Sequence, residues 1–158
     1  MRVGETIGSI LSNPYLITPV LAWAIAQIIK TLIYAIQNKR LDLSRLFGDS
    51  GMPSAHTAIV TSLATISLLR DGAASFQFAV SAILALIVCH DARGVRAEVG
   101  KQAVTLNGIL EDFRKLNLLE GDAEQKLKEL VGHTPFQVFC GAITGILTGV
   151  IVNGLFPV

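Results

Sequence analysis

The sequence predicts an all-α protein, a polytopic membrane helical bundle of about four transmembrane helices with an amphipathic helical loop on its cytoplasmic side. Hydrophobic residues make up 51% of the 158 residues and charged residues only 16%, whereas typical soluble domains carry about 25% charged residues. Apolar runs of membrane length recur along the chain, and Lys and Arg gather between them. A soluble bundle of buried helices is the alternative that this pattern leaves.

The apolar runs define the predicted spans within a single membrane domain, 1–158. A spanning helix needs about 20 apolar residues. The first run contains one charge, Lys30, and the last contains none. The two central runs are shorter. The spans are expected at about 14–36, 54–70, 73–91 and 135–156.

The segments outside the spans also show helical patterns. Residues 4–12 are expected to form a short interfacial or half-inserted helix. In the loop 93–132, apolar residues recur at helical spacing over 97–116, which predicts an amphipathic helix lying over the bundle or on the membrane surface. The alternative is that the helix breaks at Asn107-Gly108. A second, shorter helix is expected at 123–130.

The distribution of positive charge orients the spans. Of the 13 Lys and Arg residues, ten fall in 37–53 and 92–133, which four spans place on one side of the membrane. The positive-inside rule makes that side cytoplasmic, or its topological equivalent in an organelle. Both of the motifs described next begin a span on this side.

Two histidines stand where a loop meets an apolar run. The first closes Gly-Met-Pro-Ser-Ala-His at 51–56, and the second, His133, lies in Gly-His-Thr-Pro at 132–135. Free N–H groups at a helix start favour an anion. Of two histidines at such starts, one can attack phosphorus while the other protonates the leaving oxygen. The alternative is a pair of interfacial histidines with ordinary hydrogen bonds.

Cations and a carboxylate accompany the histidines on that face. Lys30 could bring its ammonium to the same level, or simply extend toward water without a function. Arg93 and Arg96 follow the third span, and their planar forks suit phosphate, although they could equally be positive-inside anchors. Asp91 could pair with these cations or orient a histidine. A metal site built from His56, His90, His133 and Asp91 is conceivable, but no two of these histidines have ligand-like local spacing, so no metal is expected. No cofactor is expected either.

The last span carries a stripe of small residues. Gly141, Gly145 and Gly149 follow one another at intervals of four, so they share one helix face where another backbone can approach closely. The stripe would either pack inside one chain or form the seam of a homodimer.

These motifs resemble the type-2 phosphatidic acid phosphatase superfamily, which includes bacterial acid phosphatases and vanadium haloperoxidases, and more closely its divergent branch of small membrane proteins. The sequence at 51–56 is similar to the Pro-Ser-Gly-His motif, 132–138 to the terminal His motif, and Lys30 to the Lys of the first motif. The run 91–96, with 100–103 and 106–107, looks specific to the divergent branch. The likeness covers nearly the whole chain.

The resemblance implies roles for individual residues. His133 would be the nucleophile that forms a phosphohistidine, and His56 the acid for the leaving group. Lys30 and an Arg would bind phosphate oxygens, and Ser54 would donate a hydrogen bond. The superfamily chemistry needs no metal. The chain also departs from the pattern, because the usual Arg-Pro of the first motif and the Ser-Arg before the terminal His are absent.

A second departure concerns the group that orients the nucleophile. Gln137 stands where the superfamily has an Asp. In the first motif, where the Arg-Pro is absent, Gln37 stands seven residues after Lys30. Arg93 and Arg96 would then replace the missing phosphate ligands, and Asp91 or Glu129 the orienting carboxylate.

The expected function is a membrane phosphatase that hydrolyses a lipid phosphate or pyrophosphate at the cytoplasmic face of a bacterial plasma membrane or a plastid membrane. The alternative is a non-catalytic protein that binds anionic lipid or acts as a scaffold on a degenerate phosphatase fold. A transporter is less favoured, since few polar residues fall at mid-bilayer. The lipid substrate and the bilayer are the expected partners, and no nucleic acid is expected.

Overall fold

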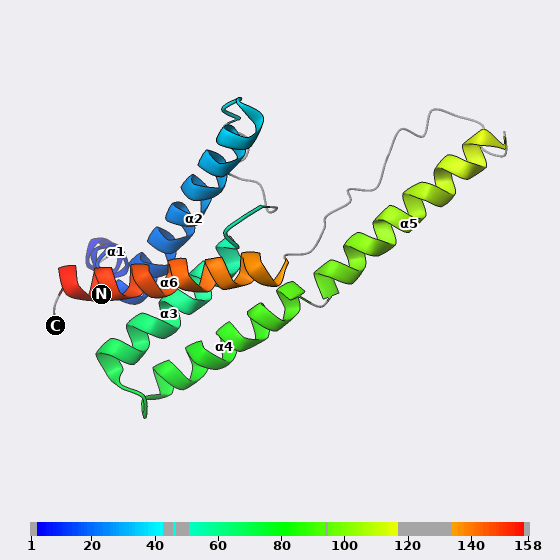
Figure 1. Cartoon of the computed structure of the whole chain (residues 1–158). Coiled ribbons are helices and arrows are strands. Elements are labelled where there is room, and N and C mark those ends of the chain that lie inside the picture. The colour runs from blue at the N-terminus through cyan, green and yellow to red at the C-terminus, as the bar shows by residue number, and fades with distance from the viewer. Residues whose placement is uncertain (1–2, 43–45, 47–50, 94, 117–133, 157–158) are drawn as a thin grey trace.

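The computed structural model describes residues 3–42, 46, 51–93, 95–116 and 134–156. The helices of these residues are shown in Figure 1, and none of these residues forms a strand. The all-α prediction is therefore confirmed. The helices are α1 (Val3–Leu11), α2 (Pro14–Asn38), α3 (Ala55–Asp71), α4 (Phe76–Arg93), α5 (Val95–Lys115) and α6 (Pro135–Leu155).

Helix α2 has defined caps at both ends. Asn13 is the N-cap, and its side-chain oxygen accepts a 2.9 Å hydrogen bond from the backbone N–H of Tyr15. Pro14 occupies the first turn, where its missing N–H has no helical partner to lose. Lys39 ends the helix in the left-handed conformation at φ 50°. Helix α2 therefore ends at Asn38, two residues beyond the predicted end of the first span.

Helix α3 is the centre of the bundle and contacts α2, α4 and α6. It buries the small polar side chains of Thr57, Ser62 and Ser67 along with Ile66. Thr61, Ser62 and Thr65 donate hydrogen bonds of 2.7 to 2.8 Å to carbonyls one turn earlier in the same helix. Because their hydroxyl groups are satisfied locally, these residues can be packed against neighbouring helices without losing hydrogen bonds.

The glycine stripe of α6 packs against α3. A Cβ added at Gly141 would lie 2.5 Å from the carbonyl oxygen of Ser54, and one at Gly149 would lie 2.7 Å from Cβ of Thr65. At Gly145 it would collide with the side chain of Thr61. The stripe is therefore occupied by α3 of the same chain. Association of two copies stays a prediction and would need a surface beside this one.

The two ends of the bundle are distinguished by polar contacts. Tyr15, at the start of α2, donates a 2.7 Å hydrogen bond to Asp71, the last residue of α3. Arg70 donates to the carbonyl oxygen of Phe156, which caps the end of α6. The start of α2 and the ends of α3 and α6 thus meet at one end of the bundle. The end of α2 and the starts of α3 and α6 meet at the other.

Helices α2 and α6 are long and apolar enough to cross a membrane, and α4 has a shorter apolar stretch over Phe76–Ala92. Their outward faces carry large exposed apolar side chains, such as Val20, Ile36 and Ile151. A bundle with two clear candidate spans suits a membrane protein. The four predicted spans each coincide with a helix, and crossing by α3 and α4 stays a prediction.

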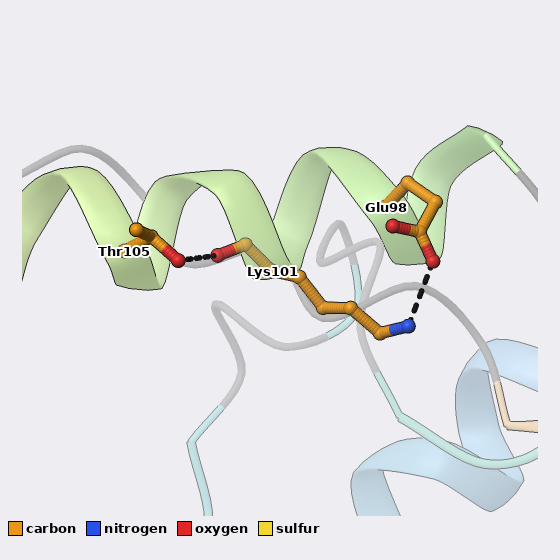
Figure 2. Close-up of polar contacts among 3 residues, drawn as sticks. All are labelled: Glu98, Lys101 and Thr105. Atoms are coloured by element: carbon orange, nitrogen blue, oxygen red, sulfur yellow. Dashed lines mark hydrogen bonds and ion pairs between the residues drawn. The ribbon is translucent and has the colours of Figure 1, made fainter.

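Helix α5 runs without interruption through Asn107-Gly108, so the expected amphipathic helix is present and the alternative break is not. Among the described helices it contacts only α4, and it extends away from the bundle in Figure 1. Figure 2 shows its polar face, where Lys101 pairs with Glu98 at 2.7 Å and Thr105 donates to the Lys101 carbonyl at 3.1 Å. Packing over the bundle is thus not observed, and a place on the membrane surface stays a prediction.

The N-terminal segment forms α1, as expected for residues 4–12, and this helix contacts α2. The second loop helix, expected at 123–130, lies outside the described residues.

Candidate functional site

The two histidine motifs are joined by a backbone hydrogen bond. The N–H of Ser54 donates to the carbonyl oxygen of Gln137 at 3.1 Å. This bond places the start of α3 directly against the first turn of α6. Segments that are far apart in the sequence therefore form one site at the same end of the bundle.

The first turn of α6 is a capping box. Thr134 Oγ1 accepts a hydrogen bond from the N–H of Gln137 at 3.3 Å, and Gln137 Oε1 accepts one from the N–H of Thr134 at 3.0 Å. Pro135 follows in the first turn. This arrangement satisfies two N–H groups that a helix start would otherwise leave free. The amide of Gln137, which stands where the superfamily has an Asp, is therefore engaged in holding the helix start.

Ser54 is the N-cap of α3 and is fully buried. Its Oγ accepts hydrogen bonds from the N–H of Thr57 at 3.4 Å and from the Thr57 hydroxyl at 3.1 Å. Ser54 lines neither of the two cavities described below. The contacts shown by this residue are those of a helix cap, and its predicted bond to phosphate stays a prediction.

Lys30 is enclosed by the protein, with only 4% of its surface exposed. Its aliphatic stem runs past Gly51, where an added Cβ would lie 2.9 Å from Lys30 Cγ. Gly51 has a φ of 119°, a conformation that favours glycine. The Gly51 turn therefore closes over the lysine stem. An extended side chain reaching open water, the simplest alternative for Lys30, is not what the structure shows.

Lys30 lines a cavity of about 350 Å³ at this end of the bundle. Gly51, Thr134 and Gln137 bring the two motifs to its wall, together with Gln37 from the last turn of α2. Its volume lies in the range of small-molecule sites. We call it the outer cavity.

A second cavity, of about 60 Å³, lies between α2 and α3. Trp23, Gln27 and Lys30 line it from α2, and His56 and Ile59 from α3. We call it the inner cavity. Lys30 lines both cavities, and His56, which is half-buried, lines the inner one. The structure thus brings Lys30 and His56 together around one small space.

The other predicted site residues are placed less fully. His133 lies outside the described residues and directly precedes Thr134 in the sequence. Arg93 ends α4 and Arg96 stands in the first turn of α5, where only their backbone is described. Asp91 is half-buried in the last turn of α4 and lines neither cavity. Within the described ranges, no three His, Cys, Asp or Glu side chains are grouped as metal ligands.

Sequence reasoning missed two residues of the inner cavity, Trp23 and Gln27. The signal was present, because residues at i, i+4 and i+7 share a helix face and Lys30 marks which face of α2 is buried. The capping box was also readable from Thr134 and Gln137, which have the Ser/Thr-x-x-Glu/Gln pattern.

The described chain is an all-α bundle in which the starts of α3 and α6 lie together beside an enclosed lysine. The chain belongs to the Divergent PAP2 family, whose sequence profile matches residues 11–148. The resemblance inferred from the motifs is therefore confirmed.

The chain is also similar to a bacterial membrane protein. It is 40% identical over 155 residues to the uncharacterized membrane protein YuiD of Bacillus subtilis (strain 168), an alignment that covers 93% of this chain and 98% of that protein. No solved structure matches the chain. The relative and the two apolar helices together support a membrane location.

Proposed function

We propose that the protein hydrolyses a lipid phosphate or diphosphate at the end of the bundle where α3 and α6 begin. The observation that carries this proposal is the enclosed Lys30 in the wall of both cavities, beside His56 and the joined starts of α3 and α6. An ammonium group in a site of low dielectric attracts an anion strongly. Two helix starts add the positive ends of their dipoles.

The proposed reaction has two steps. A ring nitrogen of His133 attacks phosphorus, forming a P–N bond as the P–O bond to the lipid breaks, and His56 gives its proton to the leaving oxygen. Water then attacks phosphorus of the phosphohistidine, forming a P–O bond as the P–N bond to His133 breaks, while His56 takes a proton from that water, and phosphate is released. Lys30 holds phosphate oxygens in both steps.

Other residues complete the proposed site. Arg93, Arg96 and Ser54 hold further phosphate oxygens, and Asp91 orients the His133 ring. Since the apolar outward faces of the helices contact lipid, the substrate's tail stays in the bilayer while its phosphate reaches the outer cavity.

The positive-inside rule assigns this end of the bundle to the cytoplasmic face or its equivalent. The similarity to a Bacillus subtilis membrane protein supports a bacterial plasma membrane over a plastid membrane. Reactivity of an introduced cysteine at exposed Asn38 toward a membrane-impermeant reagent in intact cells would contradict this orientation.

The test is phosphate release from lipid phosphates by the purified protein in mixed micelles. The wild type is expected to release phosphate, and His133→Ala to abolish release while lipid binding is retained. His90→Ala, which removes the third histidine of the chain, serves as the matched control and keeps turnover. Unchanged turnover in His133→Ala would remove that residue from the mechanism.

A second candidate function is the binding of anionic lipid without catalysis. The observation that favours it is the capping box, because the Gln137 amide is engaged with Thr134 and supplies no carboxylate for a histidine. A catalytic imidazole is normally held in one tautomer by such a group. Lipid binding that needs Lys30, without phosphate release and without sensitivity to His133→Ala, would support this candidate.

A further inference from the structure

The inner cavity contains a buried acceptor that nothing in the described chain satisfies. Gln27 is only 5% exposed, and its Oε1 accepts no hydrogen bond from the described residues. Buried polar atoms are almost always paired, and an unpaired one costs about 1 to 3 kcal/mol. Because Gln27 lines the inner cavity, a donor that enters this cavity can reach the side chain.

The walls of the cavity restrict what that donor can be. Trp23 and Ile59 supply apolar surface, while Lys30 and His56 supply the polar groups of the proposed phosphate site. A volume of about 60 Å³ admits a small polar group and excludes a second large headgroup. An amide oxygen can accept a hydrogen bond from a neutral hydroxyl, whereas the ionised oxygens of a second phosphate have no proton to donate to it.

The position of His56 determines how a phosphoester bound at Lys30 would be oriented. His56 lines the inner cavity, and Lys30 lines both cavities. In the proposed reaction, Lys30 holds the phosphate and His56 protonates the leaving oxygen. The alcohol attached to that oxygen would then point toward Trp23 and Gln27, which line the same cavity as His56. The atoms next to the leaving oxygen would lie nearest to Gln27.

We propose that the inner cavity is a subsite for a free hydroxyl carried by the leaving alcohol, and that Gln27 accepts its hydrogen bond. This inference rests on the proposed function in placing the phosphate at Lys30. It narrows the substrate class to phosphomonoesters of glycerol-like lipid alcohols, in which a hydroxyl neighbours the phosphoester carbon. Prenol or simple fatty-alcohol phosphates carry no such group.

The test uses Trp23, the single tryptophan of the chain, as a probe in the wall of the cavity. Two non-hydrolysable phosphonates are titrated in mixed micelles while its fluorescence is recorded. One is the analogue of a 1-acylglycerol 3-phosphate with its free 2-hydroxyl, and the other is the 2-deoxy form. The wild type is expected to bind the hydroxylated form about tenfold more tightly, as one good hydrogen bond allows.

The variant Gln27→Met removes the acceptor and keeps the side-chain length. It is expected to bring the ratio of the two dissociation constants close to one. Thr18→Val is the matched control, since the Thr18 hydroxyl is the other buried and unpaired polar group of α2 and Thr18 lines neither cavity. That variant is expected to keep the tenfold ratio.

Equal affinity of the wild type for the two phosphonates would overturn the inference, and so would an unchanged ratio in Gln27→Met. Since neither compound is turned over, a protein that releases no phosphate can still show the ratio, which separates this inference from the proposed catalysis. Failure of both phosphonates to bind would remove the phosphate site and the subsite together.

Discussion

Ser54 and Gln137 are joined by a 3.1 Å hydrogen bond from the backbone N–H of the first to the carbonyl oxygen of the second. This bond holds the start of α3 against the start of α6. Gly141 lies one turn further along α6 and also packs against the Ser54 carbonyl. The site at this end of the bundle therefore depends on close backbone contact between α3 and α6.

Gly51→Ala should destabilise the turn over Lys30. The φ of 119° strains an alanine by about 1 to 3 kcal/mol, and its Cβ would lie 2.9 Å from Lys30 Cγ. Thermal unfolding in detergent, followed by circular dichroism, should show a lower midpoint. The matched control is Gly108→Ala in α5, where an added Cβ meets nothing within 4 Å. It should be neutral or stabilising by up to about 1 kcal/mol. A midpoint that falls equally in the two variants would contradict this account.

Gln137→Glu should preserve the stability of α6, and Gln137→Met should lower it by about 1 kcal/mol. A Glu at this position can still accept from the Thr134 N–H, and its charge suits the positive end of the helix dipole. Thermal unfolding of the three proteins measures the difference. If Gln137→Met were as stable as the wild type, the capping box would contribute nothing.

Gly145→Ala should weaken the contact between α3 and α6. Its Cβ would collide with Thr61 and with the Ala58 carbonyl, and overpacking of this kind costs about 1 to 3 kcal/mol. Gly154→Ala on the same helix is the matched control, because its Cβ would meet nothing within 4 Å. Denaturant titration in detergent should separate the two variants. Equal stability would show that α6 does not use this face against α3.

Helix α5 is expected to lie on the membrane surface with its apolar face toward lipid. Leu106, Ile109 and Phe113 are exposed in the chain alone, and such a face is stable at a lipid interface. An environment-sensitive label on Leu106→Cys, in a background without Cys89 and Cys140, should shift its emission to the blue when the protein enters vesicles. A label on Lys101→Cys, on the polar face, should not. Identical emission at both positions would contradict the interfacial placement.

The helices of the fold could be predicted from the sequence because each depends on a local sequence pattern. Apolar runs and caps define the helices, and α5 follows from its helical spacing. The contact between α3 and α6 could not be predicted, since it depends on which face of each helix is turned inward. The glycine stripe indicated a close approach, but its partner could have been another helix or another chain.

The candidate site divides in the same way. Lys30 stands out as the one charge within its apolar run, and His56 as a polar group at the start of the next run. Gln27 does not, because its importance comes only from the cavity that it shares with them. The role of Gln137 was hidden by the comparison with an Asp, although its spacing from Thr134 already indicated a cap.

The central claim is that Lys30 holds an anion between the starts of α3 and α6. Calorimetric titration with orthovanadate, a phosphate analogue, tests it most directly. Lys30→Met keeps the stem and removes the charge, so its affinity should fall at least about tenfold, as expected for the loss of a charged hydrogen bond. The surface variant Lys101→Met should bind like the wild type. Equal affinity in the wild type and in a folded Lys30→Met variant would contradict the account.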